Sequence, residues 1–337
     1  MQLRRLRNRT ARHAGILTST PPSRPAPDPL RGSRPTALAT TTALPVGGLI
    51  QLFASVVLLS SAWPLTKIAL AAGTTPLWFA EGRAVLSGLT ACLLLALTKG
   101  IRLPTRPAIP AILAIGGLQL GAYFALAHEA VAWVPAGRTA ILANTTTIWV
   151  VPLSLIFLRE HIPARRWLAA ALGVAGVAVL MNPLAIDWTS TPILIGHIFL
   201  LGAGLSWSIA IMVTRTARPN RTMFEMLPWC FLVGALVLAP LVAWHAPSGT
   251  FGTSPAAWGA LAYIGLIAGP LGTWCIMEAT AKLPTLVSSV GFLTTPAVSL
   301  LLANVFLHEP FTPDLLAGSA LIMAGVACAA WPKRRTA

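Results

Sequence analysis

Residues 158–163, LREHIP, and residues 307–313, LHEPFTP, each follow a long apolar run and place a glutamate where that run stops. The two copies share further positions at one constant offset along the chain: Phe157, Leu158, Glu160, Gly176 and Pro183 match Phe306, Leu307, Glu309, Gly325 and Pro332. The tetrapeptide AGVA at 175–178 returns at 324–327. A repeat of this length is one structural unit used twice, so the nature of that unit decides the fold.

The composition is that of a membrane protein. Hydrophobic residues make up 55% of the 337 residues and charged residues only 10%, whereas about a quarter of the residues in soluble domains are charged. A helix needs about 20 predominantly apolar residues to cross a bilayer. Ten stretches meet this criterion: 48–71, 78–98, 108–128, 136–158, 164–182, 191–214, 223–244, 256–277, 285–307 and 313–331. We therefore expect an all-α integral membrane protein with ten transmembrane helices in a lipid bilayer.

The positions of lysine and arginine predict how these spans are oriented, because cytoplasmic connectors are enriched in both residues. If residues 1–47 are cytoplasmic, the segments on that side hold 21 of the 24 basic residues, and the connectors on the other side hold none. One missed span would destroy this partition. The sequence therefore predicts a multi-pass protein of the cell membrane, inner or plasma, with both termini in the cytoplasm.

Three segments divide the chain. Residues 1–47 are rich in arginine and proline and predict a disordered basic tail, with a targeting segment or an over-extended start as alternatives. Residues 48–182 and 191–331 are the two five-helix repeats. Because five is an odd number, the second repeat enters the bilayer inverted relative to the first, as in many secondary transporters. The net charge of +15 lies in the tail and connectors rather than on an aromatic face, so it does not indicate a nucleic-acid partner.

The residues that carry these features resemble a known family. The resemblance lies in SAWPLTKIAL at 61–70, in PLWFAEGRAVLSG at 76–88, and in the two helix-ending glutamates followed by GVAGVA at 173–178 and MAGVA at 323–327. In their order across ten spans they are similar to the EamA-type transporters of the drug/metabolite transporter superfamily. The resemblance implies a two-repeat carrier that exports or exchanges a small organic metabolite or drug across the cell membrane.

The sequence carries no motif of an enzyme or a metal site. HEAVA at 128–132 and HEPFT at 308–312 lack the second histidine of a zinc-binding helix, and no Gly-rich phosphate loop is present. The four cysteines are not spaced as C-x-x-C. We therefore expect no catalytic residue, no metal and no cofactor, and we expect transport to run on a gradient.

Charged residues inside the spans are functional candidates because a charge in the bilayer is costly. Lys67, Glu81, Arg83 and Arg138 lie toward the outer side, and Glu129 lies in the adjacent outer connector. Together they predict an outward vestibule with a surplus positive charge that suits an anionic group. The alternative is that the basic side chains reach the headgroups as anchors, which we favour for Arg138. For Lys67 and Arg83, substrate binding or internal ion pairing stays open beside anchoring.

Uncharged polar and aromatic residues complete the candidate substrate site. Beside Lys67 and Arg83, the candidate substrate-binding residues are Trp63, Tyr123, His197, Trp207, Trp274 and Asn304, with Gln119 one helical turn before Tyr123. They would line a cavity between the two repeats. Interfacial tryptophans and interhelical hydrogen bonds are the alternative roles. His197 would additionally permit coupling to protons.

Glu160 and Glu309 are interpreted differently, as structural caps. Each ends a helix before a proline-containing turn, where its carboxylate would meet the exposed amides of the following helix.

The leading hypothesis is a gradient-driven transporter of a small molecule. The alternative is a membrane-embedded transferase or lipid-modifying enzyme, which would need paired acids or histidines at one membrane face. A scaffold or receptor is a third possibility, but it has no need of an inverted repeat. The sequence leaves the substrate, the coupling ion and the oligomeric state open.

Overall fold

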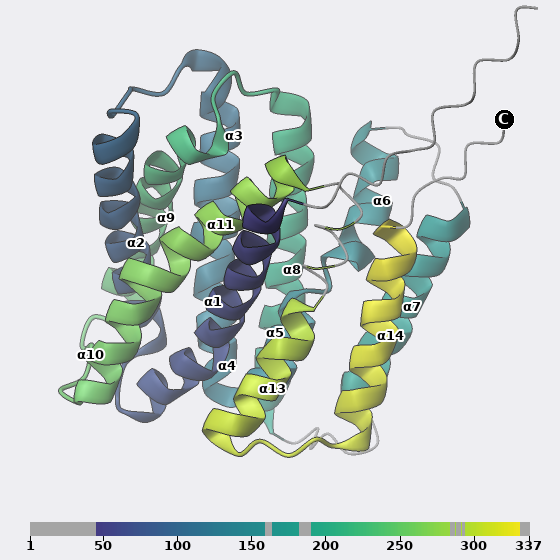
Figure 1. The fold of residues 1–337 in the computed structure, drawn as a ribbon. Coiled ribbons are helices and arrows are strands. Elements are labelled where there is room, and N and C mark those ends of the chain that lie inside the picture. Colours follow the sequence, from purple (N-terminus) through teal and green to yellow (C-terminus); the bar gives the residue numbers. More distant parts are fainter. Residues whose placement is uncertain are drawn as a thin grey trace, which may run out of the picture. The chain divides into compact units, whose positions relative to one another are not determined.

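A computed structural model describes residues 45–158, 164–181, 190–283, 287, 291 and 294–330 (Figure 1). The described residues are helical and include no strand. The helices of the first half are α1 (Val46–Ala71), α2 (Pro76–Thr98), η1 (Arg106–Ala108), α3 (Ile109–Ala114), η2 (Ile115–Ala122), α4 (Tyr123–Trp133), α5 (Ala136–Ala143), α6 (Thr146–Leu158) and α7 (Ala164–Met181). Those of the second half are α8 (Thr191–Ala217), α9 (Met223–His245), α10 (Pro255–Ala262), η3 (Tyr263–Ala268), α11 (Gly269–Lys282), α13 (Thr295–Leu307) and α14 (Pro313–Ala330).

Seven helical segments are long and apolar enough to cross a membrane. They are Val46–Ala71, Pro76–Thr98, Arg106–Trp133, Ala136–Phe157, Thr191–Ala217, Met223–His245 and Pro255–Ile276. Three shorter apolar helices, Trp167–Leu180, Thr295–Leu307 and Pro313–Cys328, accompany them. The expected all-helical membrane fold is confirmed, and the count of ten spans stays a prediction.

Local signals start several helices, one predicted boundary is wrong, and one predicted span contains an internal turn. Pro76 and Pro255 occupy the first turns of α2 and α10, where a missing N–H costs nothing. The third span does not stop at residue 128 but continues to Trp133, so Glu129 lies on α4 and not in a connector. The expected span 136–158 is interrupted between α5 and α6, where the side chains of Asn144 and Thr145 donate hydrogen bonds to carbonyls of α5.

The repeat seen in the sequence reappears in the helix boundaries. The bounds of α13 and α14 follow those of α6 and α7 at the same offset that relates Glu309 to Glu160, and so does the end of α11 relative to the end of α4. Both halves also contain a π-helical stretch at a similar place, η2 before α4 and η3 before α11. Such stretches are rare and are often found at functional sites. The hydroxyl of Ser206 in α8 donates to the carbonyl of Leu118 within η2 at 2.8 Å.

The repeated AGVA tetrapeptides lie at a close contact between the two halves. A Cβ atom added to Gly176 in α7 would lie 2.8 Å from the carbonyl oxygen of Gly318 in α14, and one added to Gly325 would lie 2.7 Å from the carbonyl oxygen of Ala169. Only glycine permits backbones to approach this closely, as is common between membrane helices. The repeat therefore preserves the residues that let α7 and α14 pack together.

The remaining contacts between the halves are reciprocal. The first helix of the first half, α1, packs on α11 and α13, and the first helix of the second half, α8, packs on α4 and α6. The second helices, α2 and α9, pack on each other. Figure 1 shows α2 and α9 side by side, and α7 beside α14. Each half therefore completes the packing of the other.

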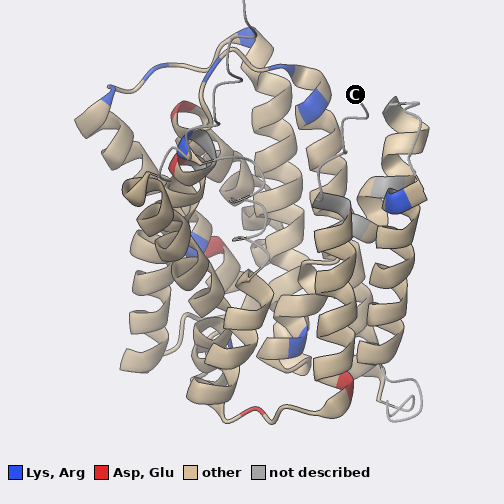
Figure 2. Ribbon diagram, turned by 45° about the vertical axis from the view of Figure 1, so that its right-hand side comes forward, with Lys and Arg blue, Asp and Glu red and all other residues tan. Residues whose placement is uncertain are grey.

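The connectors also pair across the halves. Thr105 of the connector 99–105 contacts Asn220 of the connector 218–222 at 2.5 Å between Oγ1 and Oδ1. Elsewhere, Thr75 N donates to the Thr250 carbonyl at 2.9 Å, which joins the connector 72–75 to the connector 246–254. The first pair of connectors contains lysine and arginine and the second pair contains neither. We call the end that carries 99–105 and 218–222 the basic end; Figure 2 shows the blue segments that gather along the connectors there.

Candidate functional site

An arginine and a chain of aromatic rings lie between α2, α4 and α8. The guanidinium carbon of Arg83 lies 4.2 Å from the centre of the Phe124 ring. Tyr123 lies beside Phe124, with 6.2 Å between ring centres, and packs edge-on against Trp207 at 4.9 Å. Because Arg83 and Tyr123 come from the first half and Trp207 from the second, these residues join the two halves. We call Arg83, Tyr123, Phe124, His128 and Trp207 the Arg83 cluster.

The guanidinium of Arg83 forms no ion pair with a carboxylate among the described residues. Its Nε is shielded from solvent and finds no hydrogen-bond acceptor there, and none of its nitrogens lies within 4.0 Å of a described carboxylate oxygen. Its favourable contact is with the face of Phe124, a cation–π contact. A cation inside a span without a counter-charge is expensive in a membrane protein and marks a functional candidate.

His128 adds a polar group to this cluster. Its ring centre lies 5.5 Å from that of Phe124 and 5.8 Å from that of Phe79 in α2. Its Nδ1 lies 2.7 Å from the Phe124 carbonyl oxygen, whereas its Nε2 is buried with no partner among the described residues. The cluster therefore contains two nitrogen atoms, on Arg83 and His128, that the described chain does not satisfy.

A second group of charged residues lies at the turn between α4 and α5, and these charged groups have partners within the protein. Lys67 in α1 donates from Nζ to the carbonyl oxygens of Val131 (2.6 Å), Ala132 (3.1 Å) and Val134 (3.2 Å). These carbonyls stand at the C-terminal end of α4, where no further helical amide can reach them. A cation at this end is also favoured by the helix dipole. All three N–H groups of the ammonium are thus used within the protein.

Glu309 occupies the other side of the same turn. Its carboxylate accepts from the amides of Ala136 (Oε1, 2.6 Å) and Gly137 (Oε2, 2.8 Å), the first residues of α5. The prediction that Glu309 is a structural cap is confirmed, but the helix is not the following one, α14. It is α5 of the other half, reached because α5 packs on α13. Glu160, its counterpart, lies outside the described residues.

An ion pair joins the two halves at this turn, and a hydrogen bond within the second half lies beside it. Arg138 in α5 pairs with Asp314 at the start of α14, with 2.6 Å between Nη2 and Oδ2 and side chains 20% and 17% exposed. Asn304 Nδ2 donates to the backbone carbonyl of Glu309 at 2.8 Å. We call Lys67, Glu309, Arg138, Asp314 and Asn304 the α4–α5 clamp.

The predicted vestibule is therefore only partly assembled. Lys67 and Arg138 do lie at one turn, but each is engaged by the protein: Lys67 by carbonyls and Arg138 by Asp314. Arg138 is ion-paired with Asp314, and its interpretation as a headgroup anchor stays a prediction. Glu81 has a shielded Oε2 with no partner among the described residues. A substrate role for Lys67 stays a prediction.

The other predicted candidates are dispersed. Trp63 is half-buried against the same core that Trp207 contacts. His197 has its Nδ1 2.8 Å from the Ile193 carbonyl oxygen, and its buried Nε2 has no described partner. Trp274 is half-buried in α11. Gln119 lines a separate pocket of about 250 Å³ with Arg215 near the basic end.

Sequence reasoning missed Phe124, His128 and Asp314. Phe124 is one phenylalanine among many apolar residues, and only its position next to Tyr123 on the same helix could have singled it out. His128 stands out in the sequence only within an incomplete metal motif. Across the described ranges no group of three histidine, cysteine, aspartate or glutamate side chains could hold a metal ion.

Comparisons with known proteins agree with this fold. The sequence profile of the EamA-like transporter family matches residues 46–182 and again residues 194–331. The uncharacterized transporter YvbV of Bacillus subtilis is 26% identical over 275 residues, which are 78% of this chain and 85% of that protein. A probable terminal-alkyne amino-acid exporter of Streptantibioticus cattleyicolor is 27% identical over 228 residues, 67% of this chain and 75% of that protein.

A solved crystal structure that is 19% identical covers 84% of this chain and 96% of its own, with a TM-score of 0.57, and shows the likeness of the fold alone. The two profile matches cover each repeat and most of the chain. The resemblance predicted from the sequence is confirmed: this chain belongs to the EamA-like transporter family, and it is a membrane transporter.

Proposed function

We propose that this protein is a gradient-driven carrier that exports or exchanges a small organic solute bearing a carboxylate group, and that Arg83 binds this carboxylate. The observation that carries the proposal is the guanidinium of Arg83, which lies on the ring of Phe124 without a carboxylate partner among the described residues. A charge left uncompensated in a low-dielectric interior is strongly destabilising. An anionic ligand would remove that cost each time it binds.

The shape of the guanidinium favours a carboxylate. Arginine presents a planar fork of N–H donors that matches a carboxylate with two parallel hydrogen bonds. With one face of Arg83 against Phe124, the edge of the fork remains for such a contact. The Nε of Arg83 is shielded from solvent and lacks an acceptor in the described chain, so a carboxylate that reached it would supply the missing acceptor.

The neighbouring rings suit an apolar side chain on the same solute. Tyr123 and Trp207 meet edge to face, and their surfaces would cover a hydrocarbon or aromatic group. An amino acid with an apolar side chain combines these two features. The relative in Streptantibioticus cattleyicolor, named as a probable amino-acid exporter, supports this class of solute. The transporter names of the relatives also favour a carrier over a transferase or lipid-modifying enzyme.

In this proposal the protein crosses the cell membrane ten times, as two inverted repeats, and both of its termini lie in the cytoplasm. Helix bounds related by one constant offset and the reciprocal packing of α1 and α8 support the relation between the repeats. The basic end would face the cytoplasm. The α4–α5 clamp would then lie toward the outside and would have to separate when the site opens there. Proton coupling through His197 remains part of this proposal.

Counterflow in proteoliposomes tests the function. Vesicles containing the purified protein are loaded with an unlabelled solute, and uptake of labelled apolar amino acids is compared with that of their amides, which lack the carboxylate. We expect accumulation of at least one acid and none of the matching amide. Equal transport of acid and amide would disprove the role of the carboxylate, and no movement of any organic acid would disprove the proposed solute class.

A further inference from the structure

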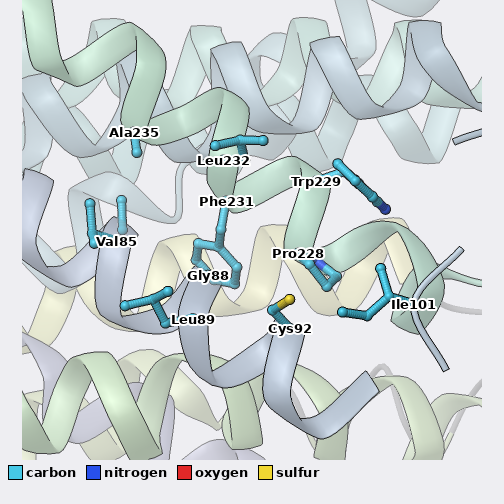
Figure 3. A pocket seen from close by; sticks show the side chains of 11 residues that line it. Val85, Gly88, Leu89, Cys92, Ile101, Pro228, Trp229, Phe231, Leu232 and Ala235 are labelled. Atoms are coloured by element: carbon cyan, nitrogen blue, oxygen red, sulfur yellow. The ribbon is translucent and has the colours of Figure 1, made fainter. Parts of the chain in front are cut away.

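An apolar groove lies between α2 and α9, and its lining residues do not include any member of the Arg83 cluster. It has a volume of about 240 Å³ and is lined by Ala84, Val85, Gly88, Leu89, Cys92, Ile101, Pro228, Trp229, Phe231, Leu232 and Ala235. Figure 3 shows the side chains of Leu89 and Cys92 from one helix facing those of Phe231 and Pro228 from the other. None of the described residues that line the groove is charged.

The groove is open to the surroundings of the helices. Its rim includes Leu89, 61% exposed, and Leu232, 49% exposed. On a protein that spans a bilayer, such exposed apolar side chains face lipid. Water gains nothing in a groove without polar partners, so an apolar chain is the occupant that this lining suits.

One end of the groove reaches the basic end of the molecule. Ile101 belongs to the connector 99–105, and the indole nitrogen of Trp229 donates to the Arg102 carbonyl at 3.2 Å, which holds this connector over the groove. Lys99, Arg102 and Arg106 are exposed. Glu225 is the described acid nearby, but it pairs with Arg221 at 3.8 Å and caps α9. Arg102 and Arg106 have no ion pair among the described residues.

We propose that this groove binds one acyl chain of an anionic phospholipid, whose phosphate is held by Lys99, Arg102 and Arg106. Both ends of one molecule are matched: the apolar groove suits the chain, and the exposed cations suit the headgroup. Arg102 and Arg106 have no ion pair among the described residues, and the ammonium of Lys99 lies 5.7 Å from the centre of the Phe224 ring. Basic residues next to transmembrane helices attract anionic lipid, at about 1 kcal/mol for each residue near the surface. A second copy of this chain would bring the same cations against each other, which disfavours dimerisation through this face. The proposal does not depend on the identity of the transported solute.

Native mass spectrometry of the full chain in detergent tests the site. Phosphatidylglycerol and phosphatidylcholine with identical acyl chains are added in equal amounts, and the lipid adducts are counted. We expect phosphatidylglycerol to be retained at least fivefold more than phosphatidylcholine. Cys92→Trp, which fills the groove, and the triple substitution Lys99→Gln, Arg102→Gln, Arg106→Gln should each remove this preference. The triple variant changes exposed residues only, so it stays informative if Cys92→Trp does not fold.

Two matched controls separate this site from general lipid contact. Leu93→Trp places the same bulk on α2 at a residue that is 58% exposed and does not line the groove. Arg215→Gln removes an exposed cation of the basic end outside the groove. Both should keep the preference. Equal retention of the two lipids, loss in the controls as large as in the test variants, or a dimer that Cys92→Trp abolishes would each overturn the proposal.

Discussion

Lys67 and Arg83 are both basic residues inside apolar helices, but they differ in the partners that the protein gives their charged groups. The ammonium of Lys67 meets three backbone carbonyls at the end of α4, and the carboxylate of Glu309 sits on the first amides of α5. Arg83 lies on the face of Phe124 and has no ion pair among the described residues. A charge inside a span whose donors are all used is explained by the fold, whereas one with a donor left without an acceptor is a candidate for binding a ligand. Charge inside a span is therefore not enough to identify a substrate site; the partners decide.

The clamp also explains how a short turn can join two helices inside a membrane protein. The carbonyls that end α4 and the amides that begin α5 would otherwise be unsatisfied. Lys67 supplies donors to the first set and Glu309 supplies acceptors to the second. The contacts of Lys67 stay within the first half. Glu309 and Asp314 belong to the second half and contact α5 of the first, so these two contacts hold the halves together.

The largest effect is expected at Arg83. Arg83→Gln removes the free charge while keeping a polar side chain of moderate length, so the transport rate should fall about a hundredfold, equivalent to the loss of about 3 kcal/mol from one charge-assisted contact. Initial rates in proteoliposomes at matched protein content measure this. The melting temperature should not fall, because an uncompensated charge has been removed. Arg83→Lys should recover part of the rate, and a wild-type rate in Arg83→Gln would return Arg83 to a structural role.

Substitution of Lys67 should lower the stability of the protein, and this loss is expected to be the primary effect rather than a loss of substrate binding. Lys67→Met leaves three carbonyls at the end of α4 without donors, and we expect a loss of about 2 kcal/mol in the free energy of unfolding. Thermal melting of the purified protein in detergent shows the loss as a lower midpoint. The control is Lys282→Met, which removes a lysine that is 44% exposed and paired with Glu278. A Lys67→Met protein that melts like the wild type but does not transport would make Lys67 a binding residue, as the sequence first suggested.

The sequence predicted most of what depends on local pattern. Long apolar runs identified the helices, and the glutamate at the end of one run correctly indicated a cap at Glu309. The recipient of that cap could not be predicted, since α5 belongs to the other half of the chain and meets Glu309 only through the packing of α5 on α13. The end of α4 was missed for the same reason. Residues 129–133 were expected in a connector, but a lysine from α1 satisfies the carbonyls at the end of the longer helix.

In the candidate site, too, residues that stand out in the local sequence could be predicted, and residues that depend on tertiary packing could not. Arg83 and Tyr123 could be found because a charge or a phenol stands out in an apolar run. Phe124 and His128 could not, because their importance comes only from lying against Arg83 and each other. Asn304 stood out as a polar residue, but its amide reaches the Glu309 carbonyl in the clamp and not the Arg83 cluster.

A smaller effect is expected for the ion pair of the clamp. Arg138 and Asp314 are 20% and 17% exposed, so water screens part of their attraction. A double-mutant cycle with Arg138→Gln and Asp314→Asn should give a coupling of about 1 kcal/mol in unfolding free energy. Either substitution should therefore cost less stability in the presence of the other than it does alone. Strictly additive effects would mean that the contact between the halves at this position contributes nothing to stability.

The smallest effect is expected for Trp207. Its substitution tests whether this ring contacts the solute or only packs α8 against α4. Trp207→Phe keeps an aromatic ring against Tyr123 but shortens it, and the edge-to-face contact is worth about 0.5–1.5 kcal/mol. We expect the KM for the transported solute to rise about threefold with the maximal rate unchanged, which corresponds to about 0.7 kcal/mol of binding. Trp133→Phe is the matched control, because Trp133 and Phe199 form another aromatic pair between α4 and α8, with 6.2 Å between ring centres, outside the cluster. If both variants change the KM equally, then Trp207 supports the packing of α8 on α4 without facing the solute, and the site around Arg83 must be completed by other residues.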